Sequence, residues 1–163
     1  MKKLLKVSLV TLMISGSLLN AKGIALSAGS GKFDSDNGKY MKIEWLMAES
    51  NLKNKFYWAL NMNLEKLTLD DSSLNKDITG YGMDLHVGYN IPKTNATLYG
   101  LVGFSVQSFG GTDSVGSGTG AGIIYRITNS LFTSYEVKSS SMELETGTKY
   151  DYKTSGLKVG YKF

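Results

Sequence analysis

The sequence predicts an all-β fold of eight antiparallel strands in an up-and-down meander, which we expect to close into a barrel. Apolar and polar residues alternate with a period of two along most of the chain, as in strands with two different faces. Composition points the same way, because 19 glycines and 10 tyrosines accompany a single proline. Helical periodicity is scarce, and polar connectors separate the alternating segments.

The N-terminal residues differ from the rest. Three lysines lie among the first six residues, an apolar run follows up to Leu19, and Ala21 ends a small-residue cleavage site. These features predict a secretory signal peptide at 1–21 and one barrel domain at 22–163. The alternative is a short membrane anchor, which the run disfavours because a spanning helix needs roughly 20 apolar residues.

Charge and residue usage exclude several function classes. The chain has 18 basic and 14 acidic residues, and loss of the three signal-peptide lysines leaves 15 against 14, or +1. A near-neutral chain gives no electrostatic case for a nucleic-acid partner. The absence of cysteine and the single histidine exclude disulfides, thiolate metal sites and zinc sites with several histidines. We expect no metal and no cofactor.

Four segments cover the first half of the mature chain. The segment at 23–31 is the weakest, and those at 38–48, 55–65 and 78–90 alternate clearly. Their more apolar faces carry Met41, Ile43, Trp45 and Met47; Phe56, Trp58, Leu60, Met62 and Leu64; and Thr79, Tyr81, Met83, Leu85, Val87 and Tyr89.

Four more segments complete the set. At 96–107 both faces are fairly apolar, so the phase of that strand stays open, whereas 120–127, 131–138 and 156–163 alternate. Their apolar faces carry Ala121, Ile123, Tyr125 and Ile127; Leu131, Thr133, Tyr135 and Val137; and Leu157, Val159, Tyr161 and Phe163.

The connectors predict two different ends for the barrel. Short connections at 49–54, 92–95 and around Thr128 and Asn129 alternate with longer ones. The meander should therefore have tight turns and both termini at one end, and four loops at the other. These loops are expected at 32–38, which is of medium length, and at 67–77, 108–118 and 143–152, which are long.

Charged residues avoid the apolar faces of the six clear segments. A soluble barrel would bury the apolar face, whereas a membrane barrel turns it outward to lipid and keeps polar groups inside. Strands of about 10 residues suit a tilted membrane span, and a sheet in hydrocarbon must close to pair its backbone. The expected lumen network is Lys42, Glu44, Glu65, Asp84, His86, Arg126, Glu136, Lys138, Lys158 and Lys162.

Aromatic residues on the apolar faces gather towards the turn end. Such clustering is typical of the girdle at a membrane interface. It favours the membrane barrel over the soluble alternative, a periplasmic barrel that binds an apolar ligand. The predicted interface aromatics are Trp45, Trp58, Tyr89, Tyr125, Tyr161 and Phe163.

Three stretches resemble the small eight-stranded outer-membrane barrels, namely the OmpA transmembrane domain, OmpX and the opacity-type or porin-family surface proteins. They are 98–104, 118–125 and 156–163, and the resemblance extends over nearly all of 22–163. It implies insertion in a Gram-negative outer membrane beside lipopolysaccharide, loops outside with an extracellular ligand as a partner, and usually no catalysis. It also implies that Tyr161 and Phe163 form the C-terminal signal read by the barrel assembly machinery.

His86 is the one candidate for catalysis. Asp84 lies two residues away on the same strand face and could orient it as a general base. The outer-membrane lipid A deacylases, which the chain resembles in size, carry a His-x-Ser pair, but here Gly88 occupies the second position. A lumen role for His86 is therefore the favoured interpretation, and a His–Ser pair formed across strands stays open.

The inward charges predict a plugged lumen. Opposite charges in a narrow interior pair because an unpaired one is costly, and Arg126 with Glu136 is the expected cross-strand pair. The alternative is a narrow, low-conductance pore. The glycines at 116–122 fit no phosphate-binding motif. The acids at 34–36 and 69–77 are expected to keep loops soluble, with a divalent-cation site as the alternative.

Together these features predict a non-enzymatic outer-membrane barrel with a structural role or a role in surface interaction through four long loops. A narrow pore and a lipid A-modifying enzyme are the alternatives.

Overall fold

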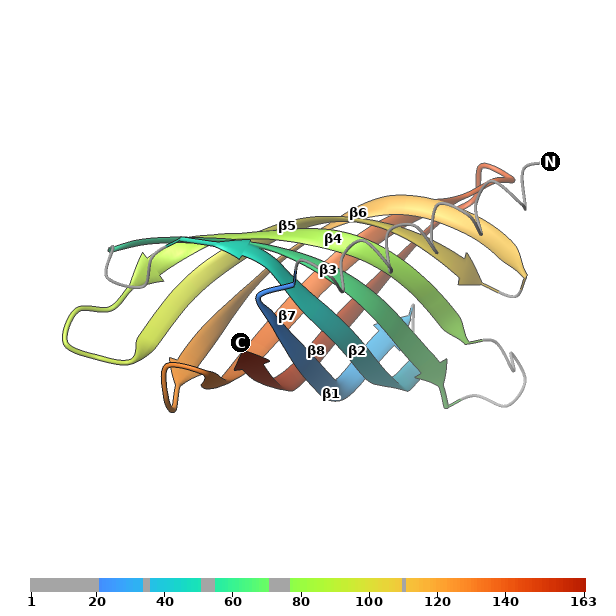
Figure 1. Cartoon of the computed structure of the whole chain (residues 1–163). Helices are drawn as coiled ribbons and strands as arrows, with labels where there is room; N and C mark the ends of the chain where they lie inside the picture. The colour runs from blue at the N-terminus through green and yellow to red at the C-terminus, as the bar shows by residue number, and fades with distance from the viewer. Residues whose placement is uncertain (1–20, 34–35, 51–54, 71–76, 110) are drawn as a thin grey trace.

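The computed structural model describes residues 21–33, 36–50, 55–70, 77–109 and 111–163. They form one closed barrel in which each strand pairs with its sequence neighbours and the first pairs with the last (Figure 1). Apart from Ala21, the predicted signal peptide lies outside these residues. Over the described ranges there is no helix long and apolar enough to cross a bilayer. The strands are β1 (Gly23–Phe33), β2 (Asp36–Glu49), β3 (Phe56–Leu69), β4 (Ile78–Asn90), β5 (Ala96–Phe109), β6 (Thr112–Arg126), β7 (Leu131–Leu144) and β8 (Lys149–Lys162).

The register of the strands fixes the stagger of the barrel. The partners of Gly23, followed once around all eight strands, lead back to Phe33 on β1, ten residues further along. With the usual strand spacing and rise, this stagger corresponds to a tilt of about 40° and a radius of about 8 Å. An eight-stranded barrel of that size has an interior that side chains can fill.

The predicted contrast between the two ends is wrong. Three of the four predicted loops are shorter than predicted, and the connections at the turn end, of six, five and four residues, are no tighter. The start of β1 and the end of β8 lie together at the turn end, where Lys162 N–H donates to Ser130 O and Phe163 N–H to Lys22 O. At the other end, β1 and β2 are separated by two residues, as are β5 and β6, and four residues separate β7 from β8. The prediction of four long loops is therefore wrong, and only the connection between Leu69 and Ile78 is long.

The residues expected in loops extend the strands instead. The strands are tilted by about 40° from the barrel axis, so a strand of 14 residues, such as β2 or β8, spans about 36 Å along that axis. The apolar band of a membrane barrel is only about 25 Å tall. The strands thus continue past the apolar band as a polar rim at the loop end. Gly111 and Gly147 adopt positive φ in the turns of this rim, where glycine is favoured.

The apolar faces point outward. Leu26, Met41 and Leu157 are each at least 60% exposed, whereas Lys42, Glu44 and Lys158, at inward positions of the same strands or their neighbours, are buried. This arrangement excludes the soluble barrel with reversed faces. It also fixes the phase of β5, whose Tyr99 and Leu101 are buried inside.

Candidate functional site

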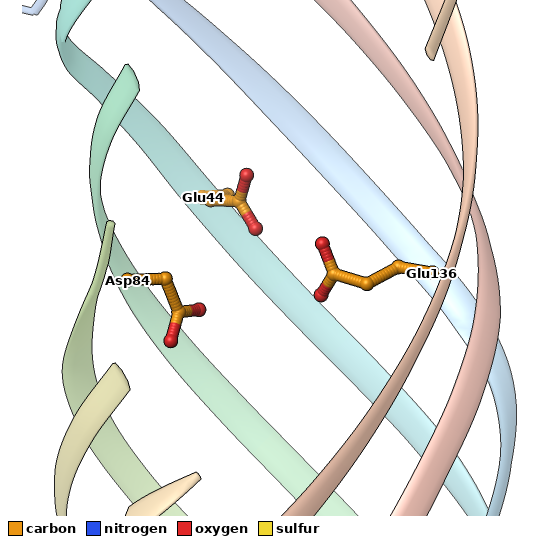
Figure 2. Close-up of side chains that lie close together, drawn as sticks. All are labelled: Glu44, Asp84 and Glu136. Carbon is orange, nitrogen blue, oxygen red and sulfur yellow. The ribbon is translucent and has the colours of Figure 1, made fainter. Parts of the chain in front are cut away.

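The middle of the lumen is an ionic layer centred on Lys42. Figure 2 shows Glu44 of β2, Asp84 of β4 and Glu136 of β7 turned towards one another inside the barrel. The Nζ atom of Lys42 lies 2.8 Å from Glu44 Oε2, 3.6 Å from Asp84 Oδ2 and 2.6 Å from Glu136 Oε1. One ammonium group therefore contacts all three carboxylates.

Two further lysines balance the layer. Lys138 Nζ lies 2.8 Å from Asp84 Oδ1, and Lys158 Nζ lies 2.7 Å from Glu44 Oε1 and 3.1 Å from Glu136 Oε2. Three cations thus face three carboxylates. Their side chains are at most 8% exposed, and charges removed from water in this way must be paired.

The carboxylate trio has the composition of a metal site, since one oxygen from each residue lies within 4.8 Å of the others. Hard divalent cations prefer such oxygen ligands. Here, however, the Lys42 ammonium lies among the three carboxylates and supplies positive charge where an ion would. The geometry gives internal ion pairing and does not support a proposal of a metal centre.

Glycines on the neighbouring strands make room for these side chains. A Cβ atom added to Gly103 of β5 would lie 2.0 Å from Asp84 Oδ1, and one added to Gly118 of β6 would lie 2.8 Å from Lys138 Cε. Real Cβ atoms do not approach other atoms so closely. The inward glycines are therefore needed for the ionic layer to fit.

Apolar layers lie above and below the ionic layer. Towards the turn end the lumen is filled by Leu46, Tyr57, Ala59, Tyr99, Leu101 and Ile124. Towards the loop end it is filled by Tyr40, Leu67, Leu69, Ile78, Met142 and Tyr152.

Glu65 lies beside the loop-end layer. It accepts hydrogen bonds from Gln107 Nε2 at 2.6 Å and from the Tyr152 hydroxyl at 2.8 Å. Lys42 is directly opposite Glu65 in the register of β2 and β3, but its ammonium points into the ionic layer. Glu65 thus belongs to a separate, mainly uncharged hydrogen-bonded group.

His86 occupies the turn-end side of the ionic layer. Its ring stacks on Tyr99 with centroids 4.4 Å apart, and Asn61 Nδ2 lies 3.3 Å from each ring nitrogen. Glu136 Oε2 lies 3.8 Å from Nε2. Within the described part of the chain, none of its hydrogen bonds involves a serine or threonine hydroxyl.

The sequence matches the family described as outer membrane protein beta-barrel domain over residues 15–163. The chain belongs to this family. A comparison with curated protein sequences finds no significant match. The match and the fold together give the location, which is the bacterial outer membrane.

Solved structures show the same architecture at low sequence identity. Neisserial surface protein A is 14% identical, with a TM-score of 0.62 over 86% of this chain and 95% of that one. The outer membrane enzyme PagL is 11% identical, with a TM-score of 0.59 over 86% and 99%. A major outer membrane protein from Thermus thermophilus is also 11% identical, with a TM-score of 0.56 over 86% and 99%. These similarities concern the fold alone.

Besides Glu65, two predicted lumen residues of this outer-membrane barrel lie apart from the ionic layer. Arg126 is at the turn end, where its guanidinium donates to Thr97 Oγ1 at 2.7 Å and to Asn90 Oδ1 at 3.3 Å. The expected pair with Glu136 is wrong, because Arg126 lies opposite Phe132 and Glu136 lies opposite Gly122 in the β6–β7 register.

The second is Lys162, which pairs with Glu49 at 2.6 Å. The sequence pattern did not identify Glu49. A register shift between Leu46 and Ala48 breaks the alternation of β2, and only the structure reveals that bulge.

The predicted interface aromatics all lie near the turn end of their strands. Five of them, Trp58, Tyr89, Tyr125, Tyr161 and Phe163, are between 38% and 78% exposed. Trp45 is different, because it keeps the outward position of its strand but is only 8% exposed. Its indole Nε1 also has no hydrogen-bond partner among the residues described. As an exposed girdle residue, Trp45 is therefore a wrong prediction.

Proposed function

We propose that this outer-membrane barrel is sealed and non-enzymatic, and that it serves as a structural component or through contacts at its outer end. The observation that carries the proposal is the filled lumen. An ionic layer of equal opposite charge lies between two layers of closely packed side chains, so the interior leaves no open path. A pore would need ion sites weak enough to release their ions, whereas the charged groups here bind one another.

The contact surface at the outer end is the polar rim of the strands rather than a set of long loops. Lys66 and Asp77 form an exposed ion pair of 2.6 Å on this rim. The hydrogen bond from Lys66 lowers the pKa of Asp77 below its ordinary value. An extracellular ligand would therefore meet mainly rigid, paired strands, together with the one long connection between β3 and β4.

Conductance tests the sealed lumen. Purified barrel in planar lipid bilayers should give no discrete current steps, because the three layers leave no open path. A well-known open porin reconstituted in the same bilayer is the control. Discrete steps that change in amplitude in Glu136→Gln would contradict the proposal and favour the narrow pore.

The fold alone does not exclude an enzyme, because the enzyme PagL has the same fold. A mass spectrum of lipid A tests this alternative. Overexpression of the wild-type chain should leave the lipid A mass spectrum unchanged, and His86→Ala should give the same spectrum. A new lipid A species that disappears in His86→Ala would overturn the non-enzymatic assignment.

The predicted assembly signal remains a proposal that can be tested in cells. Phe163→Ser should lower the amount of folded barrel in the outer membrane, since Phe163 ends the strand that closes the sheet and is 78% exposed. Phe56→Ser, which removes another exposed aromatic at the turn end, is the matched control. Equal levels of the two variants, measured as heat-modifiable protein in membrane fractions, would remove the special role of Phe163.

A further inference from the structure

Three outward lysines lie just beyond the apolar band on neighbouring strands. Along β1, β2 and β8 the last large exposed apolar side chains are those of Leu26, Met41 and Leu157. Apart from Ala28, the outward positions beyond them are polar, and they include Lys32, Lys39 and Lys153, all exposed. We call these three residues the outer lysine patch.

The register brings the patch together. Lys32 of β1 is directly opposite Lys153 of β8, and Lys39 of β2 is opposite Ser30, two residues before Lys32 on the same face. Like charges directly opposite one another across two strands destabilise a sheet. Among the residues that the structure describes, none of the three lysines forms an ion pair.

A hollow of about 740 Å³ accompanies the charges. Its lining includes all three patch lysines, the hydroxyl side chains Ser30 and Ser139, and one acid, Asp70. A second acid, Asp151, lies on β8 two residues before Lys153 and is exposed. Three ammonium groups thus outnumber the acid that lines the hollow, and hydroxyl donors lie among them. This combination suits a multiply charged anion with several acceptor oxygens.

The height of the patch indicates the source of the anion. Along the barrel axis, Lys39 lies about 5 Å, Lys153 about 10 Å and Lys32 about 15 Å beyond the last large apolar side chain of its own strand. The patch therefore begins at the level of lipid headgroups. We propose that the outer lysine patch binds the phosphate groups of a phosphorylated glycolipid of the outer leaflet. This inference rests on the proposed function, in which the polar rim faces the exterior of the cell. It identifies one partner of the polar rim.

The test is lipid binding by the folded barrel in phosphatidylcholine nanodiscs that contain diphosphorylated lipid A. A lysine near a charged membrane surface contributes roughly a fivefold change in affinity. The triple variant Lys32→Gln, Lys39→Gln, Lys153→Gln should therefore bind lipid A about a hundredfold more weakly than the wild type. Lys149→Gln removes another exposed lysine of the rim, one that lies 3.8 Å from Glu143, and should change binding little.

A second experiment changes the ligand instead of the protein. Dephosphorylated lipid A should bind the wild type as weakly as diphosphorylated lipid A binds the triple variant. Undiminished binding by the triple variant, or equal binding of the two lipids, would overturn the proposal. Full displacement by inorganic pyrophosphate would replace the lipid by a free phosphate ligand. Conductance steps would refute the sealed lumen without changing these results, so the two proposals fail separately.

Discussion

Lys42→Met should destabilise the barrel more than any other single change considered, by about 3–5 kcal/mol. Its ammonium contacts three buried carboxylates, and removal of one partner of a buried ion pair leaves uncompensated charge. The measurement is the free energy of unfolding, from urea titration of the barrel folded in lipid vesicles.

A matched variant and a compensating one make this result specific. Lys39→Met replaces an exposed lysine on the same strand and should change the free energy of unfolding by no more than about 0.5 kcal/mol. Lys42→Met combined with Glu136→Gln should recover part of the loss, since both changes remove charge from one layer. If Lys42→Met were as stable as Lys39→Met, the ionic layer would not be what holds the lumen together.

Gly103→Ala should cost about 1–3 kcal/mol, which is the usual range for overpacking. The new methyl carbon would lie 2.0 Å from Asp84 Oδ1 and 3.2 Å from Lys138 Nζ. Asp84 cannot move freely, because Lys138 and Asn63 already bind its two oxygens at 2.8 Å and 2.7 Å. The free energy of unfolding in vesicles again gives the readout.

Gly100→Ala is the control for this prediction because it lies on the same strand but faces outward. A Cβ atom there would meet only Gly120 O, at 3.8 Å. Its effect should stay within about 0.5 kcal/mol. Equal effects of the two alanines would mean that strand propensity, rather than the crowded lumen, explains the glycines.

Alternation along the strands grouped the charges on one face, and strand length with the clustering of aromatics then indicated that this face lies inside. Lys42, Glu44, Asp84 and Glu136 each stand at an inward position of a regular strand. Their partners could not be predicted in the same way. Lys42 of β2 meets Glu136 of β7 across the lumen, and that contact depends on the stagger and radius of the closed barrel. The expected pair of Arg126 with Glu136 failed because it considered only neighbouring strands.

The polar rim was missed for a related reason. In 112–118 the inward positions are the small or polar residues Thr112, Ser114, Gly116 and Gly118, because the lumen is narrow. The outward positions Asp113 and Ser117 are also polar, and Val115 is the one large apolar residue between them. The period-two signal is therefore weak, and the segment resembles a loop. The same loss of contrast concealed the inward role of Tyr152, which hydrogen bonds to Glu65.

The ion pairs of Lys158 also bear on the order of folding. Lys158 is 114 residues from Glu44 in sequence, and the two come together only when β8 joins the other strands. Until that step, Glu44 and Glu136 lack one of their cations. Contacts between such distant residues are slow to form, because the chain must first close a long loop. Closure should therefore be a late, cooperative event, and a barrel without its last strand would remain in a less stable, incompletely neutralised state.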